Sequence, residues 1–131
     1  MTRSINITPK KSNPENVCIS DLKFGIGLGT LSLPNQSICS LRGLGKQPDM
    51  EILFLQNNCL KSFSHFETQP NLRELHLEKN LIGSFFAMPA QPKLEILNME
   101  ENPIAKHPHF RLMALLAIGS QIKKINGEGK E

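Results

Sequence analysis

The sequence predicts an α/β solenoid, with a parallel sheet on its concave side and 3₁₀ or helical turns on its convex side. Three features lead to this prediction: leucines, a side-chain amide and a proline each recur along the chain at intervals of 22 residues. Equal intervals over successive units indicate a repeat protein, because one short unit cannot bury its apolar face without neighbours.

The leucine positions define the strand of each unit, which reads LxxLxLxxNxL. The apolar columns are Leu28, Met50, Leu72 and Leu94; Leu31, Leu53, Leu75 and Leu97; Leu33, Leu55, Leu77 and Met99; and Ile38, Leu60, Ile82 and Ile104. Alternate side chains of a strand lie on opposite faces, so the second and third leucines should point into the core while the residues beside them face solvent. Parallel strands of successive units should then lie about 4.8 Å apart.

A side-chain amide follows each expected strand, and a proline precedes each later one. The amides are Gln36, Asn58, Asn80 and Asn102. Because such an amide both donates and accepts hydrogen bonds, we expect a structural ladder that satisfies backbone groups of adjacent units. The prolines are Pro48, Pro70 and Pro92. They should end the convex turn and keep the chain extended into the next strand.

Three segments carry a resemblance to a known family: PDMEILFLQNNCL, PNLRELHLEKNLI and PKLEILNMEENPI. They resemble the 22-residue class of leucine-rich repeats typified by the nuclear regulatory subunit of protein phosphatase 1, which implies a right-handed, horseshoe-shaped arc. The C-terminal stretch is similar to the helical cap of that family, since Asn102-Pro103, Phe110-Arg111 and Ile122 to Gly127 follow one another in the family's order.

The chain is expected to consist of a tail and one domain. Residues 1–16 are polar and contain two prolines, which predicts a flexible N-terminal tail. Residues 17–131 should form the leucine-rich-repeat domain, with an N-terminal cover at 17–27, repeats at 28–104 and a C-terminal cap at 105–127. A solenoid has apolar edges at its ends. The cap helix should cover one of them with Phe110, Leu112, Met113, Leu115, Leu116 and Ile118.

Composition and charge argue against several classes of protein. The net charge of +3 arises from lysines and arginines scattered along the chain, unlike the basic block of a nucleic-acid or membrane-surface binder. No apolar stretch approaches the roughly 20 residues that span a bilayer, and no signal peptide is visible. Cys18, Cys39 and Cys59 are odd in number and widely spaced, which predicts reduced thiols in an intracellular protein.

No catalytic or metal-binding motif is recognisable. The sequence lacks GxSxG, HExxH and the phosphate-binding lysine loop, so we expect no enzyme activity and no cofactor. His107 and His109 offer two imidazoles, fewer ligands than a metal site needs, so no metal is expected. Thr8 is followed by Pro9 and two lysines and fits a proline-directed phosphorylation site.

The concave face is the candidate protein-binding surface. Its large apolar members are Ile52, Phe54 and Ile96. Around them lie Arg73, Glu74, His76, Glu78, Glu95 and Asn98. An apolar cluster on a sheet whose other face is buried marks a contact surface. The mainly acidic surround favours a peptide or helix with a basic segment over nucleic acid, and no membrane partner is expected. By itself the domain should be monomeric.

Repeats of this kind do not specify one biological role, because the exposed residues carry the function. The leading hypothesis is a non-catalytic adaptor, for example in a cytoskeletal, centrosomal or ciliary scaffold. The resemblance also admits a spliceosomal ribonucleoprotein component that holds an RNA-binding protein, and a regulatory subunit of a protein phosphatase. These roles imply a protein of the cytoplasm or the nucleus.

Overall fold

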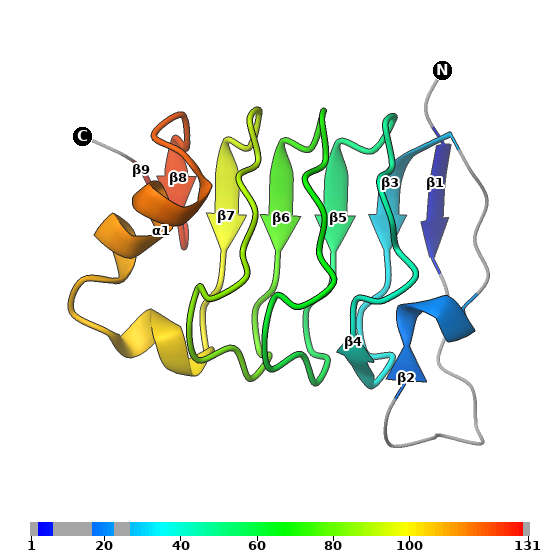
Figure 1. The fold of residues 1–131 in the computed structure, drawn as a ribbon, viewed down its shortest axis with the longest axis horizontal. Helices are drawn as coiled ribbons and strands as arrows, with labels where there is room; N and C mark the ends of the chain where they lie inside the picture. The colour runs from blue at the N-terminus through cyan, green and yellow to red at the C-terminus, as the bar shows by residue number, and fades with distance from the viewer. Residues whose placement is uncertain (1–2, 7–16, 23–26, 130–131) are drawn as a thin grey trace.

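The computed structural model describes residues 3–6, 17–22 and 27–129, which form a row of stacked repeats (Figure 1). The strands are β1 Arg3–Asn6, β2 Val17–Cys18, β3 Leu28–Ser32, β4 Ile38–Ser40, β5 Ile52–Phe54, β6 Glu74–His76, β7 Ile96–Asn98, β8 Lys124–Ile125 and β9 Glu128–Gly129. The helical segments of the described residues are η1 Ile19–Asp21, η2 Pro103–Lys106 and α1 Phe110–Ile118. The main sheet has the order β1-β3-β5-β6-β7-β8-β9, and β2 pairs with β4 in a second, two-stranded sheet. The prediction of an α/β repeat solenoid is confirmed.

Successive repeats stack in the register that the leucine spacing predicts. Leu53 lies beside Leu31 on one side and beside Leu75 on the other, and Leu75 in turn lies beside Leu97. All four side chains are fully buried, and the members of the other three apolar columns are buried as well. The inward side chains therefore form one continuous core that runs along the solenoid behind the concave sheet.

The asparagines that follow the strands join neighbouring repeats. The Oδ1 atom of Asn80 accepts a hydrogen bond from the Leu60 N–H at 3.0 Å, and its Nδ2 donates to the carbonyls of Leu55 and Leu77 at 2.9 and 3.0 Å. Asn58 and Asn102 make equivalent bonds one repeat earlier and one repeat later. These side chains supply partners for backbone groups that turn into the interior.

A second amide ladder lies where the chain turns back toward each later strand, and we did not predict it. Gln69 and Gln91 are fully buried. The Gln69 Oε1 accepts from the Gln47 N–H at 2.7 Å, and the Gln91 Oε1 accepts from the Gln69 N–H at 2.8 Å. The Gln69 Nε2 donates to the carbonyl of Gly45 at 2.8 Å. The sequence did hold a signal, because the three glutamines lie 22 residues apart, each directly before a proline.

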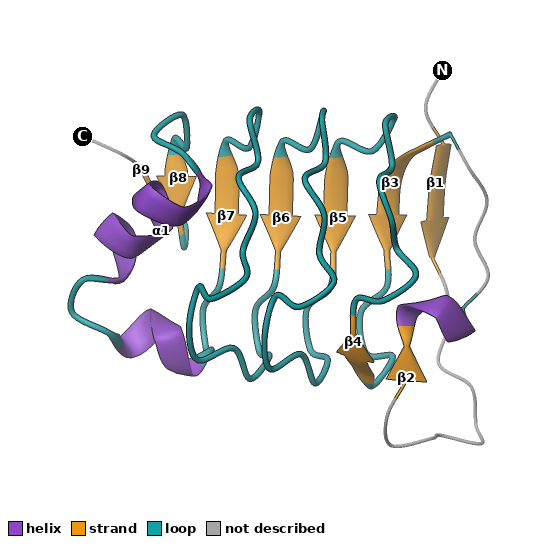
Figure 2. Ribbon diagram, in the orientation of Figure 1, coloured by secondary structure: helices purple, strands orange, loops and turns teal. Residues whose placement is uncertain are grey.

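Each convex bend is a single tight turn. The N–H groups of Leu44, Phe66 and Met88 donate to the carbonyls three residues earlier at 3.0–3.1 Å. The third residues of these turns, Gly43, His65 and Ala87, have φ values of 98°, 69° and 68°. The hydrogen bond between residues three apart agrees with the single turn that we predict here. The positive φ of the third residue, however, is typical of a type II β-turn and not of a 3₁₀ helix. Figure 2 accordingly shows loops along this side, with described helical segments at the two ends.

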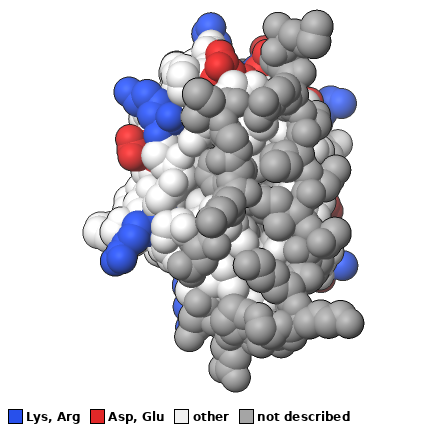
Figure 3. All heavy atoms as spheres, turned by 90° about the vertical axis from the view of Figure 1, so that its right-hand side faces the viewer, with Lys and Arg blue, Asp and Glu red and all other residues white. Residues whose placement is uncertain are grey.

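The structure differs from the prediction near the N-terminus. Arg3–Asn6, which we had placed in the flexible tail, form β1 and pair with β3, so that Ile5 lies beside Leu31. An edge strand presents unpaired backbone groups, and β1 satisfies those of β3. The rest of the predicted tail, with Thr8, lies outside the described residues. Seen from this end, described charges of both signs lie around the margin without a block of one sign (Figure 3).

The C-terminal cap continues the core through a column of aromatic rings. Phe85 stacks on Phe63 with ring centroids 5.9 Å apart, and Phe110 of α1 stacks on Phe85 at 5.7 Å. The helix buries Phe110, Ala114 and Ile118, which are spaced four residues apart. After α1, β8 pairs with β7, and β9 returns antiparallel to β8.

Leu112 and Leu116 do not cover the core, contrary to our expectation. Their residues are 55% and 77% exposed. With about 3.6 residues per turn, side chains two positions after the buried row point to the opposite side of the helix. The apolar residues of this helix therefore occupy two faces, of which only one is buried.

One position of each repeat has a left-handed backbone, and this leads to a prediction. Asn35, Asn57, Lys79 and Glu101 have φ values of 59°, 60°, 59° and 63°. Asparagine tolerates this conformation better than lysine does, and the Asn57 amide also donates to the Asn35 Oδ1. We expect Lys79→Asn to raise the free energy of unfolding by up to about 1 kcal/mol, measured by urea denaturation. The exposed Lys61 lacks this backbone conformation, and an equal gain from Lys61→Asn would contradict the explanation.

Candidate protein-binding surface

The outward side chains of the concave sheet form two columns. One column contains Thr30, Ile52, Glu74, Ile96 and Lys124. The other contains Ser32, Phe54, His76 and Asn98. Apart from the exposed Lys124, these residues are half-buried. Lys124 belongs to β8 of the cap and had not been assigned to this surface from the sequence, because its strand lies outside the regular repeat interval.

A stacked pair of rings occupies the centre of this surface. Phe54 and His76 have ring centroids 4.7 Å apart and an interplanar angle of 17°. The Nε2 atom of His76 lies 3.1 Å from the Glu74 Oε1, and its Nδ1 lies 3.8 Å from the Glu78 Oε1. The imidazole is thus fixed by a ring on one side and by carboxylates at its nitrogens, which gives the sheet a rigid, partly apolar centre.

Ile52 and Ile96 lie on either side of Glu74 in their column. The structure therefore does not join them into one apolar strip, and the apolar centre consists of Ile52 with the adjacent Phe54 and His76. Ile96 lies one strand further toward the cap. Asn98, in the second column, is engaged locally, since its Oδ1 accepts from the Glu100 N–H at 3.0 Å.

A row of alternating charges borders the sheet at the start of the strands. Arg73 lies 3.9 Å from Glu51 and 3.5 Å from Glu95, and Lys123 lies 3.8 Å from Glu95. The Arg73 side chain is 56% exposed and that of Lys123 is 71% exposed. Exposed pairs of this kind contribute little to stability. Arg73 and Lys123 nevertheless offset part of the negative charge of Glu51 and Glu95 along this border.

Two acceptor atoms at the other end of the strands accept no hydrogen bond from any residue that the structure describes. They are the Oε1 atoms of Gln56 and Glu78. Both atoms are buried, although each residue as a whole is only half-buried. Gln56 and Glu78 are 22 residues apart and so occupy equivalent positions in adjacent repeats. A buried acceptor without a donor costs free energy. Gln56 is a site residue that we had not singled out from the sequence.

The remaining candidate residues form no chemical centre. His107 and His109 are adjacent, with ring centroids 5.8 Å apart, and the His109 N–H donates to the His107 Nδ1 at 3.0 Å. Within residues 3–6, 17–22 and 27–129, no group of three or more histidine, cysteine or acidic side chains is arranged to hold a metal ion. The same residues contain no helix long and apolar enough to cross a membrane. No disulfide joins the cysteines, and the Cys18 Sγ lies 3.1 Å from the Arg42 carbonyl oxygen.

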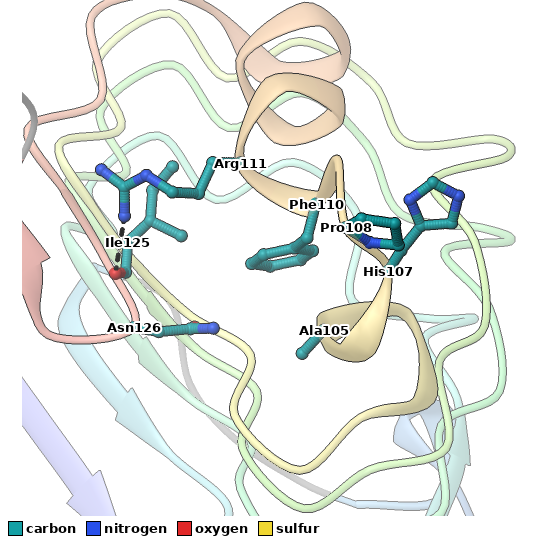
Figure 4. Close-up of a pocket in the computed structure, with 7 residues that line it drawn as sticks. All are labelled: Ala105, His107, Pro108, Phe110, Arg111, Ile125 and Asn126. Carbon is teal, nitrogen blue, oxygen red and sulfur yellow. Dashed lines mark hydrogen bonds between the residues drawn. The ribbon is translucent and has the colours of Figure 1, made fainter.

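A cavity of about 260 Å³ lies within the C-terminal cap, between η2, the start of α1 and the end of β8 (Figure 4). Arg111, His107 and Asn126 are its polar lining residues. The Arg111 Nη1 donates to the Ile125 carbonyl at 3.4 Å, and the Asn126 Oδ1 accepts from the Met99 N–H at 2.6 Å. Arg111 therefore joins α1 to β8, and Asn126 joins the end of β8 to the fourth repeat, so we assign this cavity to the structure of the cap.

Comparison with known proteins supports the fold and leaves the role open. No family model and no curated protein matches the sequence. Among solved structures, the chain is similar to one in the crystal structure of the Drosophila melanogaster SNF/U2A' complex, with a TM-score of 0.69 and 21% sequence identity. The match covers 79% of this chain and 62% of that chain. Together with the stacked parallel strands, it shows that the protein has an α/β leucine-rich-repeat solenoid fold.

Proposed function

We propose that this protein is a non-catalytic adaptor, which binds a helix or peptide of a partner protein on its concave face. Such an adaptor would act in the cytoplasm or the nucleus, for example within a cytoskeletal, centrosomal or ciliary scaffold. The binding residues would be those of the two concave columns and their border: Ile52, Phe54, Arg73, Glu74, His76, Glu78, Glu95, Ile96 and Asn98.

The observation that carries the proposal is the stacked Phe54–His76 pair at the centre of a regular, single-layer sheet. Its neighbours keep the rings half-buried, so little side-chain entropy remains to be lost when a partner covers them. Aromatic groups held in this way are frequent energetic centres of interfaces. The charged border at Glu51, Arg73 and Glu95 provides a polar rim.

The partner segment should be basic. Carboxylate groups of Glu74 and Glu78 lie near the ring nitrogens of His76, and Glu51 and Glu95 lie along the border of the sheet. Lysine and arginine side chains bring positive charge and donors without acceptors, so either would pair with these carboxylates. The phosphates of a nucleic acid would instead meet the carboxylates of Glu74 and Glu78 and be repelled.

The test is the effect of Phe54→Ala on the affinity for a partner captured from cell lysate and then purified. We expect binding to weaken by at least about 2 kcal/mol, the scale of an interface hot spot, while the melting temperature changes little because the ring lies outside the core. Ile96→Ala should weaken binding to a smaller extent. The exposed Lys61→Ala is the matched control. A partner that binds both concave variants as tightly as the parent protein would exclude this surface.

A second candidate function is that of a ribonucleoprotein component that holds an RNA-binding protein. The similarity to a chain of the SNF/U2A' complex favours it, since that chain was solved together with a protein partner. This role predicts one tightly held partner and weak affinity of the isolated domain for RNA. An adaptor should instead release and exchange its partners, which a competition experiment with labelled partner would reveal.

A further inference from the structure

The cap helix α1 has an apolar face that no described part of the chain covers. Leu112 and Leu116 lie one turn apart on its outer side and are 55% and 77% exposed. Leu116 is among the most exposed large apolar residues of the described chain. In Figure 1, α1 lies at the end of the solenoid opposite β1. Two leucines with this spacing form the kind of stripe that packs against another helix.

The cap has a charge of one sign. Residues 103–127 contain Lys106, Arg111, Lys123 and Lys124 and no aspartate or glutamate. The concave face, by contrast, contains Glu74 in β6 and Glu78 just after that strand. The basic cap therefore favours an acidic partner segment, whereas the concave sheet favours a basic one.

A basic hollow lies beyond the C-terminal end of α1. The Gln91 N–H donates to the Ile118 carbonyl at 3.3 Å, which joins the end of α1 to the start of the fourth repeat. Beside this junction lies a cavity of about 360 Å³, lined in part by Arg73, Lys93, Glu95 and Lys123. Three cations and one carboxylate give this lining a net charge of about +2 at neutral pH. The Lys123 side chain is 71% exposed, so it is accessible to a partner.

We propose that this cap surface, formed by Leu112, Leu116 and the hollow around Lys93 and Lys123, is a second protein-binding site. It would take an amphipathic helix of another protein, with an apolar stripe for the leucines and acidic residues for the hollow. The separation of apolar and charged parts favours a protein over a membrane. Helices that bind anionic membranes combine a long apolar face with basic residues on the same helix, whereas α1 contains only Arg111, which bonds to the Ile125 carbonyl.

The experiment uses a synthetic amphipathic peptide of about 15 residues, with leucines on one face and glutamates on the other, and a second peptide with lysine in place of each glutamate. Fluorescence anisotropy measures affinity for the full chain. We expect the acidic peptide to bind, and the double variant Leu112→Ser/Leu116→Ser and the single variant Lys123→Glu each to weaken it at least about tenfold. The leucines lie outside the core, so thermal melts should show that the variants stay folded. Lys61→Ala is the matched control.

The hollow shares Arg73 and Glu95 with the border of the concave sheet, so Leu112 and Leu116 are the residues that distinguish the cap site from the concave site. Phe54→Ala should leave binding of the acidic peptide unchanged, and Leu112→Ser/Leu116→Ser should leave binding at the concave face unchanged, whereas Lys123→Glu also removes a partner of Glu95 on the concave border. The cap proposal is overturned if the acidic peptide shows no saturable binding, if the lysine peptide binds equally well, or if Phe54→Ala abolishes binding. Binding of the protein to phosphatidylserine vesicles without binding to the acidic peptide would point to a membrane and also overturn it. Concentration-dependent self-association that Leu116→Ser removes would identify a second copy as the occupant and overturn it likewise.

Discussion

Replacing Leu75 by alanine is expected to lower the free energy of unfolding by about 2–5 kcal/mol, the range for truncation of a buried leucine. Leu75 is fully buried in the middle strand β6, with Leu53 and Leu97 beside it in the adjacent strands. Each repeat of a solenoid is stabilised by its neighbours, so a cavity at this position weakens two interfaces together. Urea denaturation followed by circular dichroism measures the change.

Lys61→Ala provides the comparison, because Lys61 is exposed on the convex side and its loss should change stability by less than about 0.5 kcal/mol. Equal midpoints for the Leu75 and Lys61 variants would mean that Leu75 does not lie in the core. The assignment of every outward concave residue would then fail as well, since all of them follow from the same register.

Asn80→Ala should be the second most damaging change. The side chain accepts from the Leu60 N–H and donates to the carbonyls of Leu55 and Leu77, and it is 3% exposed. Alanine removes all of these bonds and cannot admit water without a local opening. The Leu55 and Leu77 carbonyls keep a hydrogen bond from Asn58 and Asn102, but the Leu60 N–H loses its partner. A buried group left without a partner costs about 1–3 kcal/mol, which is the expected loss. Urea denaturation again measures the loss.

The neighbouring Lys79→Ala separates this effect from local disturbance. Lys79 is exposed, and lysine and alanine share the cost of its positive φ, so this variant should be nearly neutral. If the two variants lost the same stability, the loss would come from the bend of the chain and the role of the Asn80 amide would be refuted.

The repeat fold could be predicted from the sequence because each repeat packs against neighbours of the same kind. A column such as Leu31, Leu53, Leu75 and Leu97 repeats one physical requirement, and strand alternation then dictates which residues face solvent. The glutamines before the prolines carry an equally regular signal, but their role became clear only when the structure showed Gln69 and Gln91 buried among backbone groups.

The two ends of the solenoid lie outside this regularity. Ile5 lies beside Leu31, 26 positions earlier in the sequence, so the repeat interval does not reveal β1. In α1 most residues are apolar, and periodicity alone does not distinguish the buried Phe110 and Ala114 from the exposed Leu112 and Leu116. Packing of the helix against the preceding aromatic column determines which of these residues are buried.

The sequence predicts which residues line the candidate site, but it does not predict how their side chains interact. Alternation placed Phe54 and His76 on one face, but the stacking of their rings depends on side-chain torsion angles that the sequence does not encode simply. The same holds for Arg73, whose contacts with Glu51 and Glu95 reduce the acidity expected of that border.

The most direct test of concave binding is a methyl NMR spectrum of the protein, labelled at isoleucine and leucine, with and without a purified partner. If the concave face binds the partner, the methyl signals of Ile52 and Ile96 should shift on binding. Those of the buried Ile82 should stay in place, as should those of Leu112 and Leu116 unless the partner also carries an acidic helix. Shifts confined to Leu112 and Leu116, with Ile52 and Ile96 unchanged at saturation, would contradict the claim that the concave face binds the partner.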